Sequence, residues 1–321
     1  MRQDLLIGTG AGIASALMNV AVATGTALAF PLLLFHPLPI VLAGLGWGTR
    51  SVVAATVAGT LVLGVAVSIP YGAIFLLSSA APTAYFTHLI GLARTDETGR
   101  EEWYPLGRIL MLSALITGGI LMASAVVAGM NEKTFSEFWQ SFVKALVTQS
   151  GAGGTVSDEQ LRAQADTIAS MLPVVASGMA VAISILNLWL GAWIIRRSDR
   201  LTRPWQSLTT CEMPPKAAML FVGLVLLDFI PGDFGYFAGY LTGALGMAFM
   251  LIGLSVLHTV TRGTPGRPLI LIAAYGAIVV TLQAYMLAAL LFTLLGWAET
   301  FLGIRQRRGP PPRKGNGIAP D

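Results

Sequence analysis

The sequence has few charged residues, one cysteine and three histidines. Only 11% of its 321 residues are charged, whereas soluble domains typically contain about 25%. Because Cys211 is the single cysteine, the sequence excludes an intramolecular disulfide and a metal site built from several cysteines. The histidines lack metal-ligand spacing. We therefore expect no metal and no cofactor. The net charge of +4 comes mainly from arginines between apolar runs, so it indicates membrane orientation and not nucleic-acid binding.

Enzyme signatures are also missing from the sequence. There is no Gly-x-Ser-x-Gly elbow, no P-loop, no His-Glu-x-x-His and no Gly-x-Gly-Asp pair. The run GTGAG (8–12) lacks the strand and the acidic partner of a dinucleotide site. We expect a protein that is not an enzyme, and ATP-driven work would require a separate subunit.

Apolar residues are abundant, at 55% of the chain with a mean hydropathy of +0.71. Runs of about 20 apolar residues recur, which is the length that crosses a hydrocarbon core of about 30 Å. We predict an all-α, polytopic transmembrane helical bundle with about 8–10 membrane helices. The apolar runs cover 5–29, about 30–48, 52–69, 71–92, 108–129, 171–195, 216–230, 235–260 and 268–303. The last run is either one long helix or two helices that turn near Gln283.

The positions of the basic residues favour two helices in the last run. With ten helices, all of the 20 basic residues except Lys133, Lys144 and Arg162 lie on one side of the membrane. Because basic residues are enriched in cytoplasmic loops, we expect both termini in the cytoplasm of a bacterium, with the protein in its inner membrane. The integral membrane domain then covers 1–303, and a basic, proline-rich, disordered cytoplasmic tail covers 304–321.

A polar stretch, 130–170, interrupts the membrane segments on the extracytoplasmic side. Aromatic residues between Phe135 and Phe142 recur at helical spacing, which predicts an amphipathic helix in the interface. GAGG (151–154) provides a flexible joint, and Ser157 with Gln160 fits the capping box of a second short helix. The pair is either a surface hairpin on the lipid or a lid over an outward-facing cavity.

Several polar residues lie within or beside apolar runs. In LLDFIPGDFGYF (226–237), Asp233 suits a helix N-cap, whereas Asp228 falls in the last turn of a helix, where the helix dipole disfavours an anion. Asn19, Asn187 and Gln283 are typical of interhelical hydrogen bonds but also of ligand sites. Asp228, Asn187 and Asn19 are our candidate ligand-binding residues.

Small residues follow one face of the first run. Gly8 and Gly12 are spaced by four, as are Ala23 and Ala27. Such spacing allows helices to approach closely, either within the chain or at a docking face for a partner protein. Near the end of the last run, Glu299 is close enough in sequence to pair with Arg305.

Three motifs carry a family resemblance over about 5–308. The segments PLPIVLAGLGWGTRSVVAATVAG (37–59), GLSVLH (253–258) and LLGWAETFLGIRQRR (294–308) resemble the uncharacterised YybS-like bacterial membrane proteins, a family defined by a domain of unknown function. The first half also resembles the S components of energy-coupling-factor vitamin transporters. In those proteins a small-residue face on the first helix docks a coupling subunit, and Ala23 and Ala27 match its positions here.

Two functional hypotheses follow from these features. The first is a transport-related, small-molecule-binding membrane protein of the S-component kind, with a cavity open to the outside near Asn187 and Asp228 and a coupling or ATPase subunit as partner. The alternative is a non-catalytic membrane scaffold or assembly factor. It would bind anionic lipid or acidic partners through its tail and the basic loop 196–203.

Overall fold

The computed structural model describes residues 2–95, 97, 99–150, 157–206, 210–281 and 287–308. These residues form a helical bundle with one small antiparallel hairpin, which confirms the predicted all-α, polytopic architecture. The first half contains α1 (Arg2–Val20), the 3-10 helix η1 (Ala21–Thr24), α2 (Ala29–Phe35), α3 (Leu38–Trp47), α4 (Thr49–Ala66), α5 (Ile69–Phe75), the π-helical segment η2 (Leu76–Ala80), α6 (Ala81–Ile90), β1 (Ala93–Thr95) and β2 (Glu101–Trp103). The second half contains α7 (Leu106–Val127), α8 (Glu132–Ser150), α9 (Asp158–Arg197), α10 (Pro215–Asp228), α11 (Asp233–Val260), α12 (Arg267–Thr281), α13 (Leu287–Leu302) and η4 (Gln306–Arg308).

Among the described residues, seven helical segments are long and apolar enough to cross a membrane: 2–24, 29–47, 49–66, 69–90, 106–127, 159–197 and 233–260. Helices α10, α12 and α13 have 14, 15 and 16 residues. At 1.5 Å per residue they extend only about 21–24 Å, less than a typical hydrocarbon core of about 30 Å. The last apolar run is therefore two short helices, and the predicted turn residue Gln283 lies outside the described residues.

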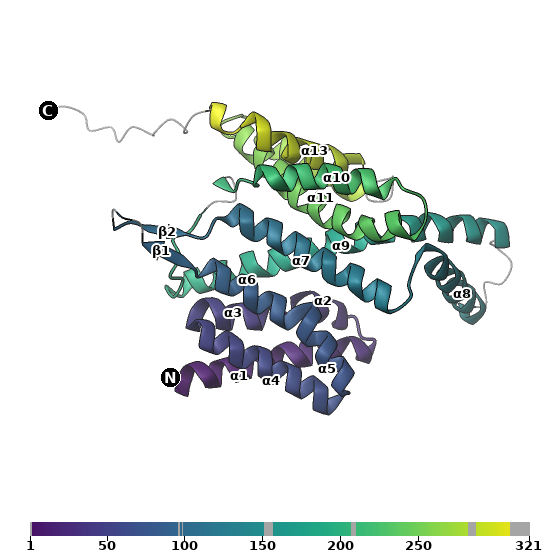
Figure 1. Cartoon of the computed structure of the whole chain (residues 1–321), viewed down its shortest axis with the longest axis horizontal. Coiled ribbons are helices and arrows are strands. Elements are labelled where there is room, and N and C mark those ends of the chain that lie inside the picture. The colour runs from purple at the N-terminus through teal and green to yellow at the C-terminus, as the bar shows by residue number, and fades with distance from the viewer. Residues whose placement is uncertain are drawn as a thin grey trace.

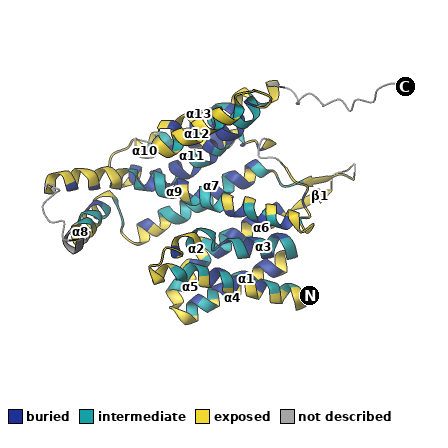
Figure 2. Cartoon of the chain, turned by 180° about the vertical axis from the view of Figure 1, so that it is seen from behind, coloured by how far each residue is buried: buried dark blue, intermediate teal, exposed yellow. Residues whose placement is uncertain are grey.

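The helices form two groups, with α7 and α9 between them (Figure 1). In the N-terminal group, α1 packs mainly on α4, and α3 contacts α1, α4 and α6. In the C-terminal group, α11 contacts α7, α9, α10 and α13. Its central window is 67% buried, compared with 22–39% for the other six long segments. As Figure 2 shows, exposed residues dominate the outer faces of the remaining helices, as expected for surfaces that contact lipid.

The two ends of the bundle differ in their elements. The start of α1, the β1–β2 hairpin and the end of α13 lie at one end, which we call the hairpin end (Figure 1). Helix α8 and the start of α9 lie at the opposite end, the α8 end. The predicted extracytoplasmic excursion and the predicted cytoplasmic segments are thus at opposite ends of the bundle.

The amphipathic character of α8 is confirmed. The rings of Phe135 and Trp139 stack with centroids 6.3 Å apart, as do those of Phe138 and Phe142, and Phe138 and Phe142 are exposed. On another face of α8, Ser136 donates a hydrogen bond to Asp166 of α9. This geometry holds α8 on α9 while aromatic side chains remain available to the membrane interface.

Two predicted boundaries differ in the structure. The capping box at Ser157 and Gln160 is present, but the helix it opens does not end before the membrane segment, and α9 continues for 40 residues. The first run also does not form one helix to Ala29. Helix α1 ends at Val20, and η1 ends at Thr24 and is capped by Gly25, whose φ of 63° is in the left-handed region.

Candidate functional site

Asn187 is part of the contacts at a break inside the second membrane segment. Pro37 has no N–H, and α2 and α3 are separate helices on either side of it, so carbonyls near the break lack helical partners. The side chain of Asn187 donates to the carbonyl of Leu34 at 2.9 Å, and Ser15 donates to the carbonyl of His36 at 2.5 Å. Asn187 is 1% exposed. Its contacts are those of interhelical hydrogen bonding, the alternative to a ligand site.

Asn19 lies between helices of the N-terminal group. The hydroxyl of Tyr71 in α5 donates to the Oδ1 atom of Asn19 at 2.9 Å. This bond joins the end of α1 to the start of α5, and it gives Asn19 a structural partner.

The two aspartates on either side of the turn between α10 and α11 occupy different environments. Asp228 is the exposed last residue of α10, as predicted, and its Oδ1 atom lies 3.0 Å from the position that a Cβ atom on Gly239 would take. Asp233 is the first residue of α11 and not its cap, which is Gly232 with a φ of 92°. Asn131 donates to Asp233 at 3.3 Å, which ties the start of α8 to α11.

The small residues of the first run divide between two settings. A Cβ atom on Gly8 or Gly12 would lie 2.2 Å from the Ser51 carbonyl or 2.1 Å from the Ala55 carbonyl of α4. These glycines therefore allow close packing within the chain, and α4 covers the face they form. Ala23 and Ala27 are exposed and lie beyond the end of α1, in η1 and the following turn.

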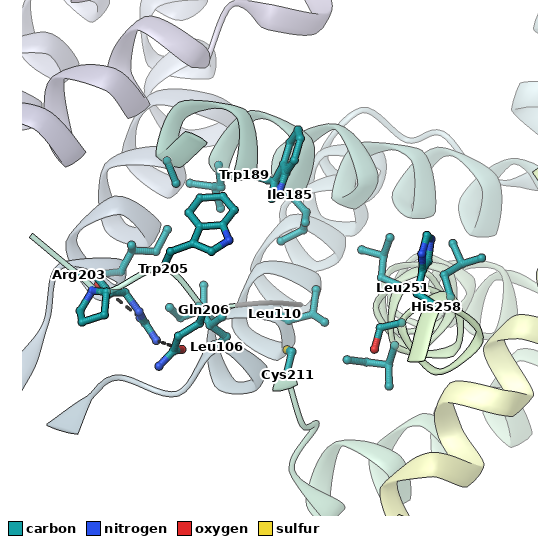
Figure 3. Close-up of a pocket in the computed structure, with 18 of the residues that line it drawn as sticks. Leu106, Leu110, Ile185, Trp189, Arg203, Trp205, Gln206, Cys211, Leu251 and His258 are labelled. Atoms are coloured by element: carbon teal, nitrogen blue, oxygen red, sulfur yellow. Dashed lines mark hydrogen bonds between the residues drawn. The ribbon is translucent and has the colours of Figure 1, made fainter. Parts of the chain in front are cut away.

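An apolar cavity of about 450 Å³ lies between the two helix groups near the hairpin end (Figure 3). Its volume is within the range of small-molecule sites, about 300–1,000 Å³. Leu106 and Leu110 of α7, Ile185 and Trp189 of α9 and Leu251 of α11 contribute apolar side chains. The polar lining comes from Arg203, Gln206, Cys211, Ser255, His258 and Tyr275.

Arg203 is the buried cation of this cavity. It is 5% exposed, donates to Gln206 Oε1 at 2.7 Å and contacts the Ile90 carbonyl at the end of α6 at 3.4 Å. Its Nε atom has no hydrogen-bond partner, and no carboxylate in the described part of the chain lies within ion-pair distance. Burial lowers the pKa of Arg203, but a guanidinium remains protonated at neutral pH.

A second cavity of about 450 Å³ adjoins the first and is more polar. It lies beside the junction of α3 and α4, with backbone from Gly44 to Thr49, and it also has Asp4, His88 and Arg200 in its lining. The two cavities share Ile90, Leu201 and Arg203. Arg203 therefore stands where an apolar chamber meets a polar one.

Arginines around this site pair with tryptophans. Arg196 lies 4.9 Å from the ring centroid of Trp205, Arg197 lies 5.1 Å from Trp193, Arg200 lies 5.0 Å from Trp47, and Arg203 lies 6.0 Å from Trp103. Stacked arginine and tryptophan side chains suit the boundary between headgroups and hydrocarbon, where an apolar ring and a charge are both accommodated.

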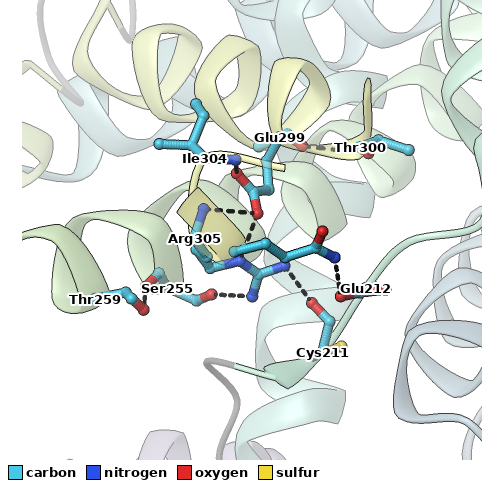
Figure 4. Close-up of polar contacts among 10 residues, drawn as sticks. Cys211, Glu212, Ser255, Thr259, Glu299, Thr300, Ile304 and Arg305 are labelled. Atoms are coloured by element: carbon cyan, nitrogen blue, oxygen red, sulfur yellow. Dashed lines mark hydrogen bonds and ion pairs between the residues drawn. The ribbon is translucent and has the colours of Figure 1, made fainter. Parts of the chain in front are cut away.

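The segment after α13 packs on the cavity wall through a buried ion pair, which confirms the predicted pairing of Glu299 with Arg305 (Figure 4). Arg305 Nε donates to Glu299 Oε1 at 2.8 Å, and its other nitrogens donate to Ser255 Oγ at 2.9 Å and the Cys211 carbonyl at 2.8 Å. Residues 304–308 thus pack against the bundle, beyond the expected domain end at 303. Residues 309–321 lie outside the described residues.

Neither cavity is lined by the ligand-binding residues predicted from sequence. Asp228, Asn187 and Asn19 are absent from both linings, and the cavities are at the hairpin end, opposite α8. The residues that sequence reasoning missed are Arg203 and its neighbours Trp205 and Gln206. Their signal in the sequence is the run of four arginines that ends in Pro204 and Trp205 in RRSDRLTRPW (196–205), which indicates a basic loop and not a cavity.

The comparisons with known proteins agree with a membrane location. A family model described as "Predicted membrane protein (DUF2232)" matches residues 12–300. A comparison with curated proteins found no match, and neither did a comparison with solved structures. The match covers six of the seven long apolar segments in full and residues 12–24 of the first, and the chain is an integral membrane protein.

Proposed function

From the premise that the chain belongs to this family of predicted membrane proteins, we propose that it binds a small amphipathic molecule within the membrane in a transport-related role. The observation that carries the proposal is the cavity of about 450 Å³ between the two helix groups. Most of its lining is apolar, and a few polar side chains, among them the hydrogen-bonded pair of Arg203 and Gln206, complete it, a composition typical of ligand sites. The proposed role is binding without catalysis.

The cavity can be tested by filling it. Ala192 of α9 lines the cavity, so Ala192→Phe adds a ring inside it. Ala273 of α12 is exposed, and Ala273→Phe is the matched control on the outer surface. We expect wild type and Ala273→Phe, purified in mild detergent, to retain one small molecule per protein by native mass spectrometry. Ala192→Phe should lose it. Equal retention by both variants, or no bound molecule in wild type, would contradict the proposal.

The likeness to S components extends the proposal to a partner. A protein that binds its ligand for transport without its own nucleotide site needs a coupling or ATPase subunit in trans. Ala23 and Ala27 are exposed and remain candidates for that contact. Ala23→Trp should remove a co-purified coupling subunit and leave ligand retention unchanged. A subunit that stays bound would exclude this face.

We propose that the protein lies in a bacterial inner membrane and that the hairpin end faces the cytoplasm. The hairpin end contains basic residues such as Arg94, Arg196 and Arg267, whereas Lys133 and Lys144 lie in α8 at the opposite end. The positive-inside rule then assigns the sides. The Lys133→Cys variant should react with a membrane-impermeant maleimide in spheroplasts whose inner membrane is intact. The Glu101→Cys variant, in β2, should react only after lysis. The reverse pattern would invert the topology.

A second candidate function is a scaffold that uses the basic residues of the hairpin end, and the Arg–Trp pairs favour it. Arginines at a membrane boundary attract anionic lipid headgroups or acidic proteins. A truncation that tests the tail must keep Arg305, because cutting after Gly303 would also remove Arg305 from the cavity wall. A chain ending at Arg308 keeps that contact. If this shortened chain loses specific co-purified proteins and keeps its melting temperature, the result would support the scaffold. If it retains the same co-purified proteins as the full chain, the tail does not bind them.

A further inference from the structure

The charge of Arg203 has no balancing anion in the described protein. Burying an unpaired charge is costly, and buried guanidinium groups normally contact a carboxylate or another oxyanion. Arg203 donates hydrogen bonds to only two neutral oxygens, although a guanidinium has five N–H donors, and its contact with the ring of Trp103 supplies no anion either. The neighbouring Cys211 does not supply the missing charge, because burial raises the pKa of its thiol to about 11 and the thiol is neutral at physiological pH.

The position of Arg203 adds a second, independent observation. It lines both the apolar cavity, bounded by α7, α9 and α11, and the polar cavity beside the α3–α4 junction. The two linings share Ile90, Leu201 and Arg203, so a molecule with its apolar part in one chamber and its polar part in the other would change polarity beside Arg203. Both chambers are at the hairpin end, and the Arg–Trp pairs found there suit a headgroup boundary.

We propose that Arg203 binds the phosphate group of a long-chain amphiphile, whose chain occupies the apolar cavity and whose head lies in the polar cavity. This inference rests on the proposed function and names the ligand class for the same site. The planar fork of a guanidinium matches two oxygens of a phosphate, and Arg200 adds a second positive charge to the lining of the head chamber.

The size and charge of the head chamber favour phosphate over a simple carboxylate. A volume of about 450 Å³ exceeds what a carboxylate needs and leaves space for a group esterified to the phosphate. Asp4 also lines this chamber, so the anion must lie toward Arg200 and Arg203. The other polar residues of the lining are Thr49, Thr87, His88 and Thr202.

The test compares three probes on the full chain in digitonin, a detergent that carries no phosphate: monododecyl phosphate, dodecanol and inorganic phosphate. Trp189 and Trp205 line the apolar cavity, so ligand entry is followed by tryptophan fluorescence. We expect wild type to bind monododecyl phosphate roughly tenfold or more tightly than dodecanol, because a charge-assisted, two-point contact is added. Inorganic phosphate alone should bind far more weakly than monododecyl phosphate.

Variants place the preference at Arg203. Arg203→Gln should reduce the affinity for monododecyl phosphate to that for dodecanol and leave dodecanol binding unchanged. Arg203→Lys, which keeps the charge but not the fork, should retain part of the preference. Arg197→Gln is the matched control, because Arg197 is exposed, stacks on Trp193 and lines neither cavity. Melting temperatures establish that each variant is folded.

The outcomes separate this inference from the proposed function. If neither dodecyl compound binds, the proposed cavity function fails. If monododecyl phosphate and dodecanol bind equally to wild type, the cavity function stands and the phosphate site is wrong. This result needs wild type alone, so it holds even if Arg203→Gln does not fold. A preference that Arg203→Gln retains would also overturn the assignment to Arg203. Inorganic phosphate that binds as tightly as monododecyl phosphate would show a free-phosphate site and contradict the amphiphile.

Discussion

Replacing Glu299 by glutamine should destabilise the protein strongly, because it removes the negative partner of a buried ion pair. Glu299 accepts hydrogen bonds from the Ile304 N–H at 2.7 Å, the Arg305 N–H at 3.3 Å and the Arg305 Nε at 2.8 Å. The side chains of Arg305 and Glu299 are 7% and 5% exposed. Breaking a buried pair by removing one partner costs about 3–5 kcal/mol, since the other charge stays buried.

The exposed pair of Arg94 and Glu102 on the β hairpin provides the matched control. Its side chains are 78% and 55% exposed, so Glu102→Gln should cost at most about 1 kcal/mol. Thermal unfolding in detergent, followed by circular dichroism, should show Glu299→Gln melting roughly 6 °C or more below wild type and Glu102→Gln near wild type.

A second readout links this pair to the cavity. Arg305 donates to the Cys211 carbonyl, so loss of Glu299 should loosen the wall and speed maleimide labelling of the single cysteine. The double variant Glu299→Leu with Arg305→Met should be more stable than Glu299→Gln, since no buried charge remains unpaired. Equal melting temperatures for Glu299→Gln and Glu102→Gln would refute the reasoning.

Three further predictions concern packing, hydrogen bonding and thiol chemistry. Gly253→Ala should lower the melting temperature, because the new Cβ would lie 1.9 Å from the Phe292 carbonyl of α13, whereas Gly276→Ala, with nothing within 4 Å, should be close to neutral. Asn187→Ala should cost about 1–3 kcal/mol in the same melts by leaving the Leu34 carbonyl without its donor; no change would show that another group satisfies it. Cys211 should react with iodoacetamide at pH 8 about a hundredfold more slowly in the folded protein than after unfolding, because burial raises its thiol pKa from 9.0 to about 11 and thiolate is the reactive form. Its rate should rise with pH up to about 11, and a folded rate equal to the unfolded one would contradict the burial of the thiol.

The helical architecture could be predicted because membrane physics constrains it tightly. Apolar runs near the length of the hydrocarbon core can only be helices there, so segments such as 108–129 and 235–260 agree closely with α7 and α11. The amphipathic spacing from Phe135 to Phe142 likewise fixes α8. The end of α1 at Val20 was missed because the following AVATGT residues remain apolar or small, and hydropathy does not register a left-handed glycine such as Gly25.

The candidate site could not be predicted in the same way, because it depends on which helices meet. Asn187 is conspicuous in an apolar run, but its role follows from the helix break at Pro37, beside which it contacts the carbonyl of Leu34, 153 residues earlier in the chain. Arg203 looks like one more loop arginine. Only the fold shows that it is buried, and that it lines both the chamber bounded by α7, α9 and α11 and the chamber beside the α3–α4 junction.

The most direct test of the account is an experimental density map of the protein in lipid nanodiscs prepared from its native membrane. We predict an elongated density in the cavity near Leu110 and Trp189, ending in a compact head in contact with the guanidinium of Arg203. A cavity closed by side chains, or Arg203 paired with a carboxylate of the protein itself, would contradict the central claim.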